Sequence, residues 1–196
     1  LSGVSGVGGA LVVQENDALS GSLELPAVTT LWSVNVRENP NLVCIDLAGL
    51  DFVERNLEIE HNDSLATINL TSLTASGEGN THVPASILEI SYNPALVEID
   101  LRSMSILLSS LRIWSNGTLA DLDGLSGLHR VYDDVSITDN ASLTSLDGLF
   151  NLERVVANLN ISYNDCLDQA EAEDFASTID VGGTTTVTDN DGPCPP

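Results

Sequence analysis

The chain has 196 residues, of which 42% are hydrophobic and only 4% aromatic, and its 29 acidic residues against six arginines give a net charge of −23. Such a field repels nucleic acid and anionic lipid, so it argues against both as partners. No apolar run reaches the length of a membrane span, which argues against direct membrane insertion of this segment.

An asparagine recurs about every 24 residues inside one hydrophobic frame. An Ile or Val precedes each copy by three residues, and a Leu follows seven of them by three. A fixed period of this length predicts stacked coils whose equivalent side chains form columns. The members, called the ladder asparagines below, are Asn16, Asn39, Asn62, Asn93, Asn116, Asn140, Asn164 and Asn190.

The frame predicts an all-β solenoid, a β-helix of about seven to eight coils of 23–24 residues with a short carboxyl-terminal capping helix. Apolar steps of three or four residues, followed by strict alternation, indicate one short strand and several turns per coil. We expect residues 1–165 to form the solenoid and residues 166–196 to form the cap.

The ladder asparagines are expected to face the interior, where each amide can bond the free backbone groups of a sharp turn and its copies in adjacent coils. Three glycosylation sequons begin at ladder positions Asn62, Asn116 and Asn140, and burial would make them poor acceptors. Asn69 and Asn160 lie off the ladder and remain acceptors in a eukaryotic secretory pathway.

The first coil starts already in register, since Leu1, Val4, Val7 and Leu11 carry the apolar spacing of later coils. Solenoids need capped ends to hide apolar columns and strand edges. We therefore expect a fragment, a mature form trimmed upstream, or a subunit that meets another subunit end on.

Cys44 stands in a column that other coils fill with small or polar residues, which predicts partial exposure. Two explanations remain open for this thiol: local shielding, or pairing with a cysteine in a missing segment or a partner.

A second polar column lies seven residues after the ladder asparagine. Carboxylates stacked in adjacent coils would repel one another. We expect each side chain to bond backbone amides at its turn, which is favoured over calcium binding as the way to relieve this repulsion. The members are Asp46, Asn69, Asp100, Asp123 and Asp147.

The step from Asn62 to Asn93 is longer than the others, which places an insertion near residues 74–82. Insertions in solenoids loop out on one face and often lie where partners bind, but this one is small and polar, so simple tolerance is an equal explanation.

Recognition would use the outward positions of the repeated strand, four and two residues before the ladder asparagine. Most of these are small or polar, but Trp114 is a large aromatic beside Arg112. A tryptophan with an arginine is a common anchor for a protein or sugar partner, although packing flat against the neighbouring coils is an equal alternative. Tyr92 and Arg37 complete the predicted ligand-binding set.

Residues 168–179 break the coil pattern and predict a short helix with acids in its first turns and an apolar side of Ala170, Phe175 and Ile179. Residues 184–188 then predict a last strand. A disulfide between Cys166 and Cys194 would close this unit, which implies an oxidising compartment. Within it, Asp189 and Asp191 begin like a calcium loop but lack the distal glutamate, so a turn is favoured over a metal site.

Residues 143–155 (LTSLDGLFNLERV) and 159–164 (LNISYN) resemble the receptor L-domain family. That family is the leucine-rich, right-handed β-helix module of insulin-type and epidermal-growth-factor-type receptors, of fungal cell-wall proteins and of bacterial surface proteins. The resemblance implies the fold and a cell-surface setting, but it implies no ligand, since members of one fold bind unrelated partners. The kinase and cysteine-rich modules of the animal receptors are absent from this sequence.

No triad spacing, phosphate loop or zinc motif appears, and the histidines, His61, His82 and His129, stand at unrelated offsets. We therefore expect a noncatalytic extracellular recognition or adhesion module without a cofactor, which binds protein or glycan through the exposed strand face. The alternatives are a self-assembling subunit of a surface layer, sheath or filament, and a carbohydrate-active enzyme that uses acids on a solenoid face.

Overall fold

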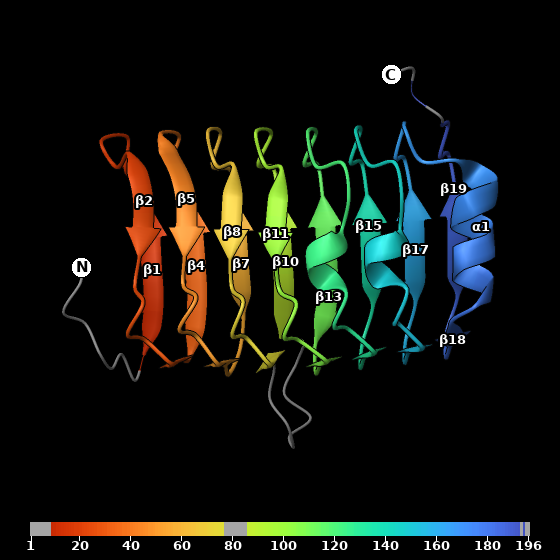
Figure 1. Cartoon of the computed structure of the whole chain (residues 1–196), viewed down its shortest axis with the longest axis horizontal. Helices are drawn as coiled ribbons and strands as arrows, with labels where there is room; N and C mark the ends of the chain where they lie inside the picture. The colour runs from red at the N-terminus through yellow and green to blue at the C-terminus, as the bar shows by residue number, and fades with distance from the viewer. Residues whose placement is uncertain (1–8, 77–85, 193, 195–196) are drawn as a thin grey trace.

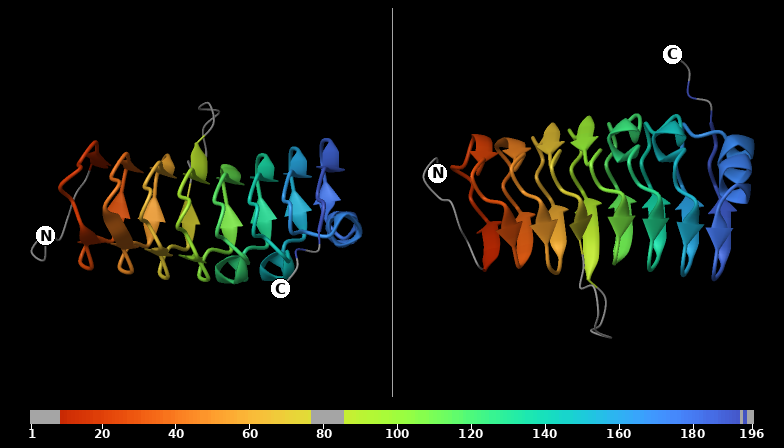
Figure 2. Two further views of the ribbon diagram at one scale, coloured as in Figure 1. Left: turned by 90° about the horizontal axis from the view of Figure 1, so that it is seen from above. Right: turned by 60° about the horizontal axis from the view of Figure 1, so that its bottom comes forward.

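The computed structural model describes residues 9–76, 86–192 and 194 and shows a parallel β-solenoid (Figure 1). The coils stack along one long axis, and a helix, α1 (Gln169–Ser177), lies at the carboxyl-terminal end of the stack (Figure 2). The predicted fold class, an all-β solenoid with a capping helix, is confirmed.

Three parallel sheets run along the stack. Sheet A holds the strand that precedes each ladder asparagine: β1 (Ala10–Gln14), β4 (Ser33–Arg37), β7 (Leu57–Glu60), β10 (Ile87–Ser91), β13 (Ser110–Trp114), β15 (Val135–Thr138), β17 (Leu159–Ser162) and β19 (Thr185–Thr188). Sheet B follows the asparagine in the early coils: β2 (Gly21–Glu24), β5 (Leu42–Asp46), β8 (Thr67–Asn69) and β11 (Glu98–Asp100).

Sheet C is built from strands of two residues: β3 (Thr30–Leu31), β6 (Phe52–Val53), β9 (Ala75–Ser76), β12 (Ile106–Leu107), β14 (Arg130–Val131), β16 (Arg154–Val155) and β18 (Asp180–Val181). The expectation of one strand per coil is therefore wrong. A strand of two residues is too short to show the alternation by which sequence patterns identify strands.

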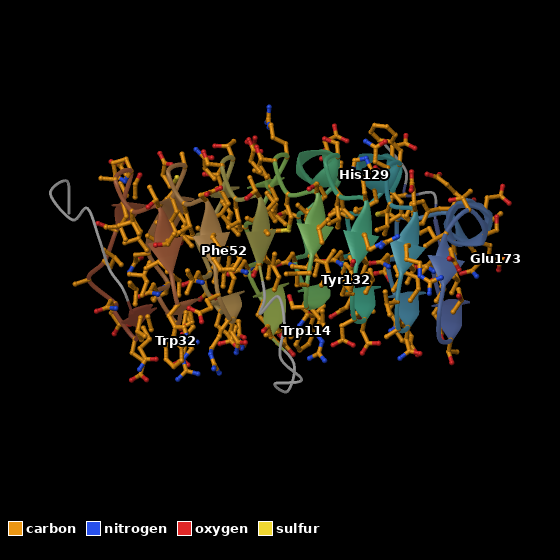
Figure 3. All side chains as sticks on the ribbon, turned by 90° about the horizontal axis from the view of Figure 1, so that it is seen from below. Trp32, Phe52, Trp114, His129, Tyr132 and Glu173 are labelled. Atoms are coloured by element: carbon orange, nitrogen blue, oxygen red, sulfur yellow. A yellow bond between two sulfur atoms is a disulfide. The ribbon has the colours of Figure 1, made fainter. Side chains whose placement is uncertain are left out.

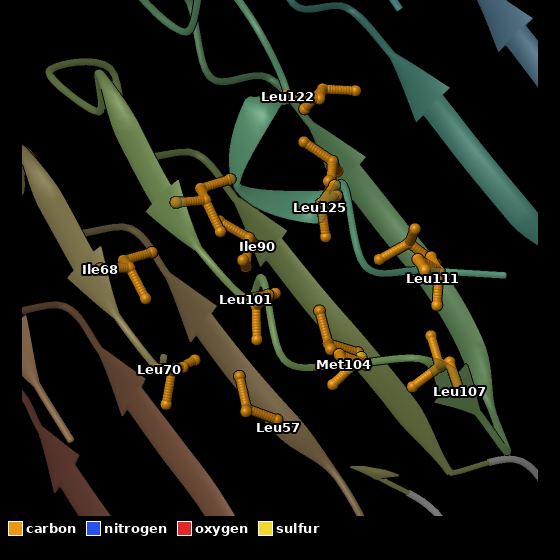
Figure 4. Packing of buried hydrophobic residues seen from close by; sticks show 14 of the residues in the cluster. Leu57, Ile68, Leu70, Ile90, Leu101, Met104, Leu107, Leu111, Leu122 and Leu125 are labelled. Atoms are coloured by element: carbon orange, nitrogen blue, oxygen red, sulfur yellow. The ribbon is translucent and has the colours of Figure 1, made fainter. Parts of the chain in front are cut away.

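Aliphatic side chains fill the space between the sheets (Figure 4). Leu111 and Ile113 point inward from β13 and are fully buried, whereas Arg112 between them is exposed. Met104 and Leu107 fill the same layer from the turns and from sheet C. No aromatic side chain is among the buried core residues of the described chain, so stacked aliphatic columns replace large rings as the source of apolar burial.

The ladder asparagines form a continuous hydrogen-bonded column, buried in the interior from Asn39 to Asn190. The prediction is wrong at Asn16, which is exposed in the first described coil and joins the column through its bond to Asn39 Oδ1 (3.0 Å). The Asn116 side-chain amide donates to the carbonyl oxygens of Ile90 (3.0 Å) and Trp114 (3.1 Å) and to Asn140 Oδ1 (3.3 Å). The Asn116 backbone N–H also donates to Asn140 Oδ1 (3.2 Å), and Asn116 Oδ1 accepts the N–H of Asn93 (3.2 Å). Each amide therefore joins three successive coils, and Asn116 is fully buried.

The residue before each ladder asparagine adopts a left-handed backbone conformation, with φ between +53° and +59°. This conformation turns the chain out of sheet A and costs a non-glycine residue about 1–2 kcal/mol. The asparagine amide stabilises the turn by bonding the carbonyl two residues back, as Asn116 does at Trp114. The column comprises Glu15, Glu38, His61, Tyr92, Ser115, Asp139, Tyr163 and Asp189.

Gln169 ends the ladder. Its Oε1 accepts the N–H (3.3 Å) and the Nδ2 (3.2 Å) of Asn190, the two bonds that the next asparagine would accept in an internal coil. Its Nε2 donates to the carbonyl of Val187 (3.1 Å). The first residue of α1 thus takes the acceptor role that the following ladder asparagine has in the internal coils.

Sheet B gives way to 3₁₀ helices after β11. The turns η1 (Asp123–Leu125) and η2 (Asp147–Leu149) occupy its place in the next two coils, and α1 follows in the last. The backbone packs very closely here, because a Cβ on Gly148 would lie 2.0 Å from the Leu122 carbonyl carbon. Glycine is therefore required at this position.

The carboxyl-terminal cap agrees with prediction in outline. Asp168 caps α1, and its Oδ1 accepts the N–H of Ala170 and of Glu171. The predicted apolar side is wrong at Ala170, which is exposed; Ala172 and Ala176 are buried instead. Ala172, Ala176 and Ile179 are spaced by four and three residues and so share one buried side, whereas Ala170 points away from it.

Two expectations fall wholly or partly outside the described residues. The predicted register of Leu1, Val4 and Val7 concerns residues that are not described. Of the insertion near residues 74–82, Thr74 bonds the Asp51 carbonyl of the coil before (3.0 Å) and residues 75 and 76 form the regular strand β9, so that part is not inserted. Residues 77–82 lie outside the described residues.

Removal of one ladder amide should be costly. Asn116→Ala removes the acceptor of the Asn93 N–H and the amide donor to the carbonyls of Ile90 and Trp114, of which the Trp114 carbonyl keeps the N–H of Tyr92 (3.2 Å). We expect a loss of about 3 kcal/mol in the free energy of unfolding. Urea unfolding would measure it. Asn41→Ala is the control, since Asn41 is exposed and makes one bond to the Asp17 carbonyl; equal losses in the two variants would contradict the ladder's role.

The Gln169 side chain should stabilise the last turn of the ladder. Gln169→Ala is expected to cost about 1–2 kcal/mol and to speed hydrogen exchange at the Asn190 amide, because that donor loses its acceptor. Glu173→Ala removes only the exposed acceptor of Gln169 Nε2 and should leave that exchange rate unchanged. Slow exchange in both variants would show that Gln169 does not close the ladder.

Candidate functional site

Three aromatic rings are in contact across three coils, Trp114 on β13 of sheet A and Tyr92 and His61 in the left-handed turns that follow β10 and β7. The rings of Tyr92 and Trp114 meet edge to face, with centroids 4.4 Å apart, and those of His61 and Tyr92 stack at 4.4 Å with an interplanar angle of 11°. Tyr92 is 38% exposed and Trp114 is half-buried. Trp114 lies near the middle of the long axis (Figure 3).

Glu89 fixes the tryptophan. Its Oε1 accepts the indole N–H of Trp114 (2.8 Å) and the hydroxyl of Ser91 (3.2 Å), while Arg112 Nη1 lies 3.9 Å from Oε2. The indole N–H is therefore held by a carboxylate, and the half-buried ring leaves part of its surface accessible.

Two further carboxylates adjoin Glu89. Glu58 lies opposite Glu89 on the adjacent strand and accepts from Asn35 (2.8 Å) and Asn56 (3.0 Å). Glu60 has no hydrogen-bond donor among the described residues, and burial, together with the charges of Glu89 and Glu58, raises its pKa above the ordinary value of 4.5. We call this set the aromatic–acidic patch: Glu58, Glu60, His61, Glu89, Tyr92 and Trp114.

The negative charge continues toward the amino-terminal coils. His61 also lines a hollow of about 480 Å³ beside the left-handed turns, and the other lining residues are Glu15, Asp17, Glu38, Pro40 and Asp63. The surroundings of the patch therefore favour groups that donate hydrogen bonds or carry positive charge.

The structure brings together three of the four predicted ligand-binding residues. Tyr92 contacts Trp114, and Arg112 lies beside Glu89 on the same face. Arg37 does not reach Trp114, because it lies on β4, three strands from β13, where its Nε donates to Gln14 (3.2 Å). At about 4.8 Å per strand, the backbones of Arg37 and Trp114 are roughly 14 Å apart. Arg37 does stand opposite Glu60 on β7, and its charge partly offsets the rise in the pKa of Glu60.

Sequence reasoning missed His61 and the carboxylates as members of this patch. A signal for His61 was available, because it precedes Asn62 as Tyr92 precedes Asn93. Nothing in the spacing shows that Glu89 receives the Trp114 indole, since that contact crosses two strands and depends on side-chain orientation.

The column seven residues after the ladder asparagine caps turns, as favoured, in three of its members. Asp46 Oδ1 accepts the N–H of Ala48 (3.1 Å), Asn69 Oδ1 accepts that of Thr71 (3.2 Å), and Asp100 Oδ1 accepts that of Arg102 (3.3 Å). Asp123 and Asp147 begin the 3₁₀ turns instead. In the first coil a register shift puts Glu24 opposite Asp46.

The weak metal candidates take part in the cap. Asp189 adopts φ +58° and accepts the hydroxyl of Thr188 (2.8 Å), and Asp191 forms an antiparallel bridge with Asp168. Within the described ranges, no group of three or more histidine, cysteine, aspartate or glutamate side chains is arranged to hold a metal ion.

The predicted disulfide is present: Cys166 and Cys194 are linked across a sequence separation of 28, with Cα atoms 4.6 Å apart. Cys44 is a free thiol and half-buried on β5, as its column predicted. A disulfide of this kind is typical of proteins in oxidising compartments.

His129 is exposed and its Nδ1 lies 2.7 Å from the Gly127 carbonyl, far along the sequence from the patch, while His82 lies outside the described residues. In the part of the chain that is described, no helix is both long and apolar enough to cross a membrane.

Comparison of the chain with protein-family models, with curated proteins and with solved structures found no match. A function for this chain is therefore inferred from the geometry of the site.

The raised pKa of Glu60 has a consequence for stability. The folded chain holds this proton more tightly than the unfolded chain, so ionisation of Glu60 costs stability as the pH rises above 4.5. Glu60→Gln should therefore raise the free energy of unfolding near neutral pH, and the gain should shrink as the pH falls toward 4.5. Urea unfolding at several pH values would measure this.

The control is Glu24→Gln, an exposed glutamate on β2 outside sheet A. It reports the general effect of removing one negative charge. A gain for Glu60→Gln that stays constant across the pH range, or that Glu24→Gln reproduces, would contradict the prediction.

Proposed function

We propose that the protein is a noncatalytic recognition module whose aromatic–acidic patch binds an extracellular protein or glycan. The observation that carries this proposal is the contact row His61, Tyr92 and Trp114, held against carboxylates on an open sheet face. Partly exposed aromatics fixed by neighbouring groups act as interface anchors, because little conformational entropy is lost when they bind.

The carboxylates define the chemistry of the ligand. Glu60 has no donor among the described residues, so it can accept from a hydroxyl, an ammonium or a guanidinium group of the ligand. An anionic ligand would be repelled by Glu58, Glu60 and Glu89. We therefore infer a polyhydroxylated or cationic ligand that stacks on Trp114 and Tyr92.

The disulfide and the resemblance to receptor L-domains support an extracellular or cell-surface setting. The alternative of a filament or sheath subunit would need free ends for stacking. Because Gln169 and α1 cover the last coil, this end of the chain favours a recognition module over end-to-end assembly.

A carbohydrate-active enzyme is the second candidate, and one observation favours it. The pKa of Glu60 is raised beside two other carboxylates, which is the asymmetry that glycoside hydrolases use for an acid and its partner. Hydrolysis of a bound glycan by the wild type, lost in Glu60→Gln, would support this candidate over the noncatalytic one.

Replacing the central aromatic should weaken binding without unfolding the chain. Equivalent positions in neighbouring coils hold Ser91 and Thr138, so Trp114→Thr places on the strand a residue that this column already accepts. We expect at least about a 30-fold loss of affinity for hits identified by screening the wild type on glycan and protein arrays.

The matched control is Trp32→Thr. Trp32 is 46% exposed and lies near sheet C, where Arg55 stacks on its ring at 4.8 Å. It should leave affinity for the same hits unchanged. Equal affinity of the wild type and Trp114→Thr would remove the proposed anchor.

A further inference from the structure

Phe150 is an exception within its column. The tenth residue after the ladder asparagine is Gly49, Ser72, Ser103 and Ser126 in the four preceding coils, and Phe150 in the next. The phenylalanine is 70% exposed, the largest exposure among the large apolar residues of the described chain. The coil therefore tolerates a small polar residue here, and folding gains little from the aromatic ring.

The ring forms one wall of a hollow between successive coils. Phe150 follows η2 directly, and α1 occupies the corresponding place in the next coil. Leu146, Phe150 and Phe175 supply the apolar lining of a space of about 350 Å³. Such a volume lies at the small end of the range for ligand pockets and accommodates one large side chain.

Carboxylates surround the apolar lining. Asp147 comes from η2, and Glu171 and Asp174 come from α1, while no basic residue among those described lines the hollow. A second copy of this chain is a poor occupant, because each copy carries a net charge of −23 and six arginines only. Charge complementarity favours a basic partner.

We propose that this hollow is a second docking site, which takes one large apolar side chain of a polypeptide segment whose flanking residues are lysine or arginine. The apolar side chain packs between Phe150 and Phe175, and the flanking cations face Asp147, Glu171 and Asp174. The site is built from η2 and α1 and shares no residue with the aromatic–acidic patch, so it does not depend on the function proposed for sheet A.

Selection from a displayed library of random short peptides tests the proposal. The wild-type protein should enrich peptides that combine Leu, Phe, Trp or Met with neighbouring Lys or Arg. Synthetic copies of these peptides should bind Phe150→Ser at least about tenfold more weakly by fluorescence polarisation. Phe150→Ser should keep the thermal midpoint of the wild type, since serine is the residue of three preceding coils.

Two matched variants complete the experiment. Tyr163→Ser removes another exposed aromatic, 58% exposed, from a different column in which Ser115 already occurs, and it should leave peptide affinity unchanged. Replacing Asp147, Glu171 and Asp174 by their amides should weaken binding and flatten its dependence on salt.

The proposal is overturned if no peptide is enriched above background, if the enriched peptides lack basic residues, or if they bind Phe150→Ser as tightly as the wild type. Loss of binding in Tyr163→Ser but not in Phe150→Ser would assign the peptides to a different surface. Peptide affinity that also falls in Trp114→Thr would place them on the sheet A face instead.

Discussion

The structure depends on the hydrogen bonds of one buried amide per coil. From Asn39 onward, each ladder asparagine bonds backbone groups at the sharp turn out of sheet A in the interior, and its oxygen accepts from the coil before it. Unpaired backbone groups in the interior would lower stability, so the amide bonds stabilise the left-handed turn. The same bonds fix the register between adjacent coils. The same chemistry explains the end of the column, where Gln169 provides the last acceptor from the helix rather than from another coil.

Because the register is fixed, each residue can be compared with the residues at the equivalent position of the neighbouring coils. Every outward position has counterparts one coil away in nearly the same backbone environment, so an unusual residue is visible as a departure from its column. Trp114 departs from a column of serine and threonine neighbours, and Phe150 departs from glycine and serine. Neither aromatic is among the buried core residues, whereas the aliphatic columns inside carry the burial that stabilises the fold. These departures therefore point to recognition rather than to stability.

Both candidate surfaces combine aromatic rings with carboxylates, and both lie on a chain of net charge −23. Such a charge opposes association between copies and disfavours anionic ligands, which is why a hydroxyl-bearing or cationic partner is proposed for each surface. At the aromatic–acidic patch the carboxylates also act within the site: Glu89 holds the indole of Trp114, while the neighbouring Glu58 and Glu89 contribute to the raised pKa of Glu60. The rigid coil spacing keeps these groups close despite their mutual repulsion.

The sequence by itself determined the solenoid, the interior position of seven of the eight ladder asparagines, the disulfide of Cys166 with Cys194, and Trp114 as an outward aromatic, because each follows from spacing along the chain. Three features were decided only by the tertiary structure. The stacking of His61 on Tyr92 and the bond from Trp114 to Glu89 depend on side-chain directions between coils. The separation of Arg37 from Trp114, and its place opposite Glu60, follow from strand order. The placement of Gln169 and Phe150 depends on where α1 packs after the periodic pattern ends, since a repeat predicts the position of its next copy but not of the element that replaces it.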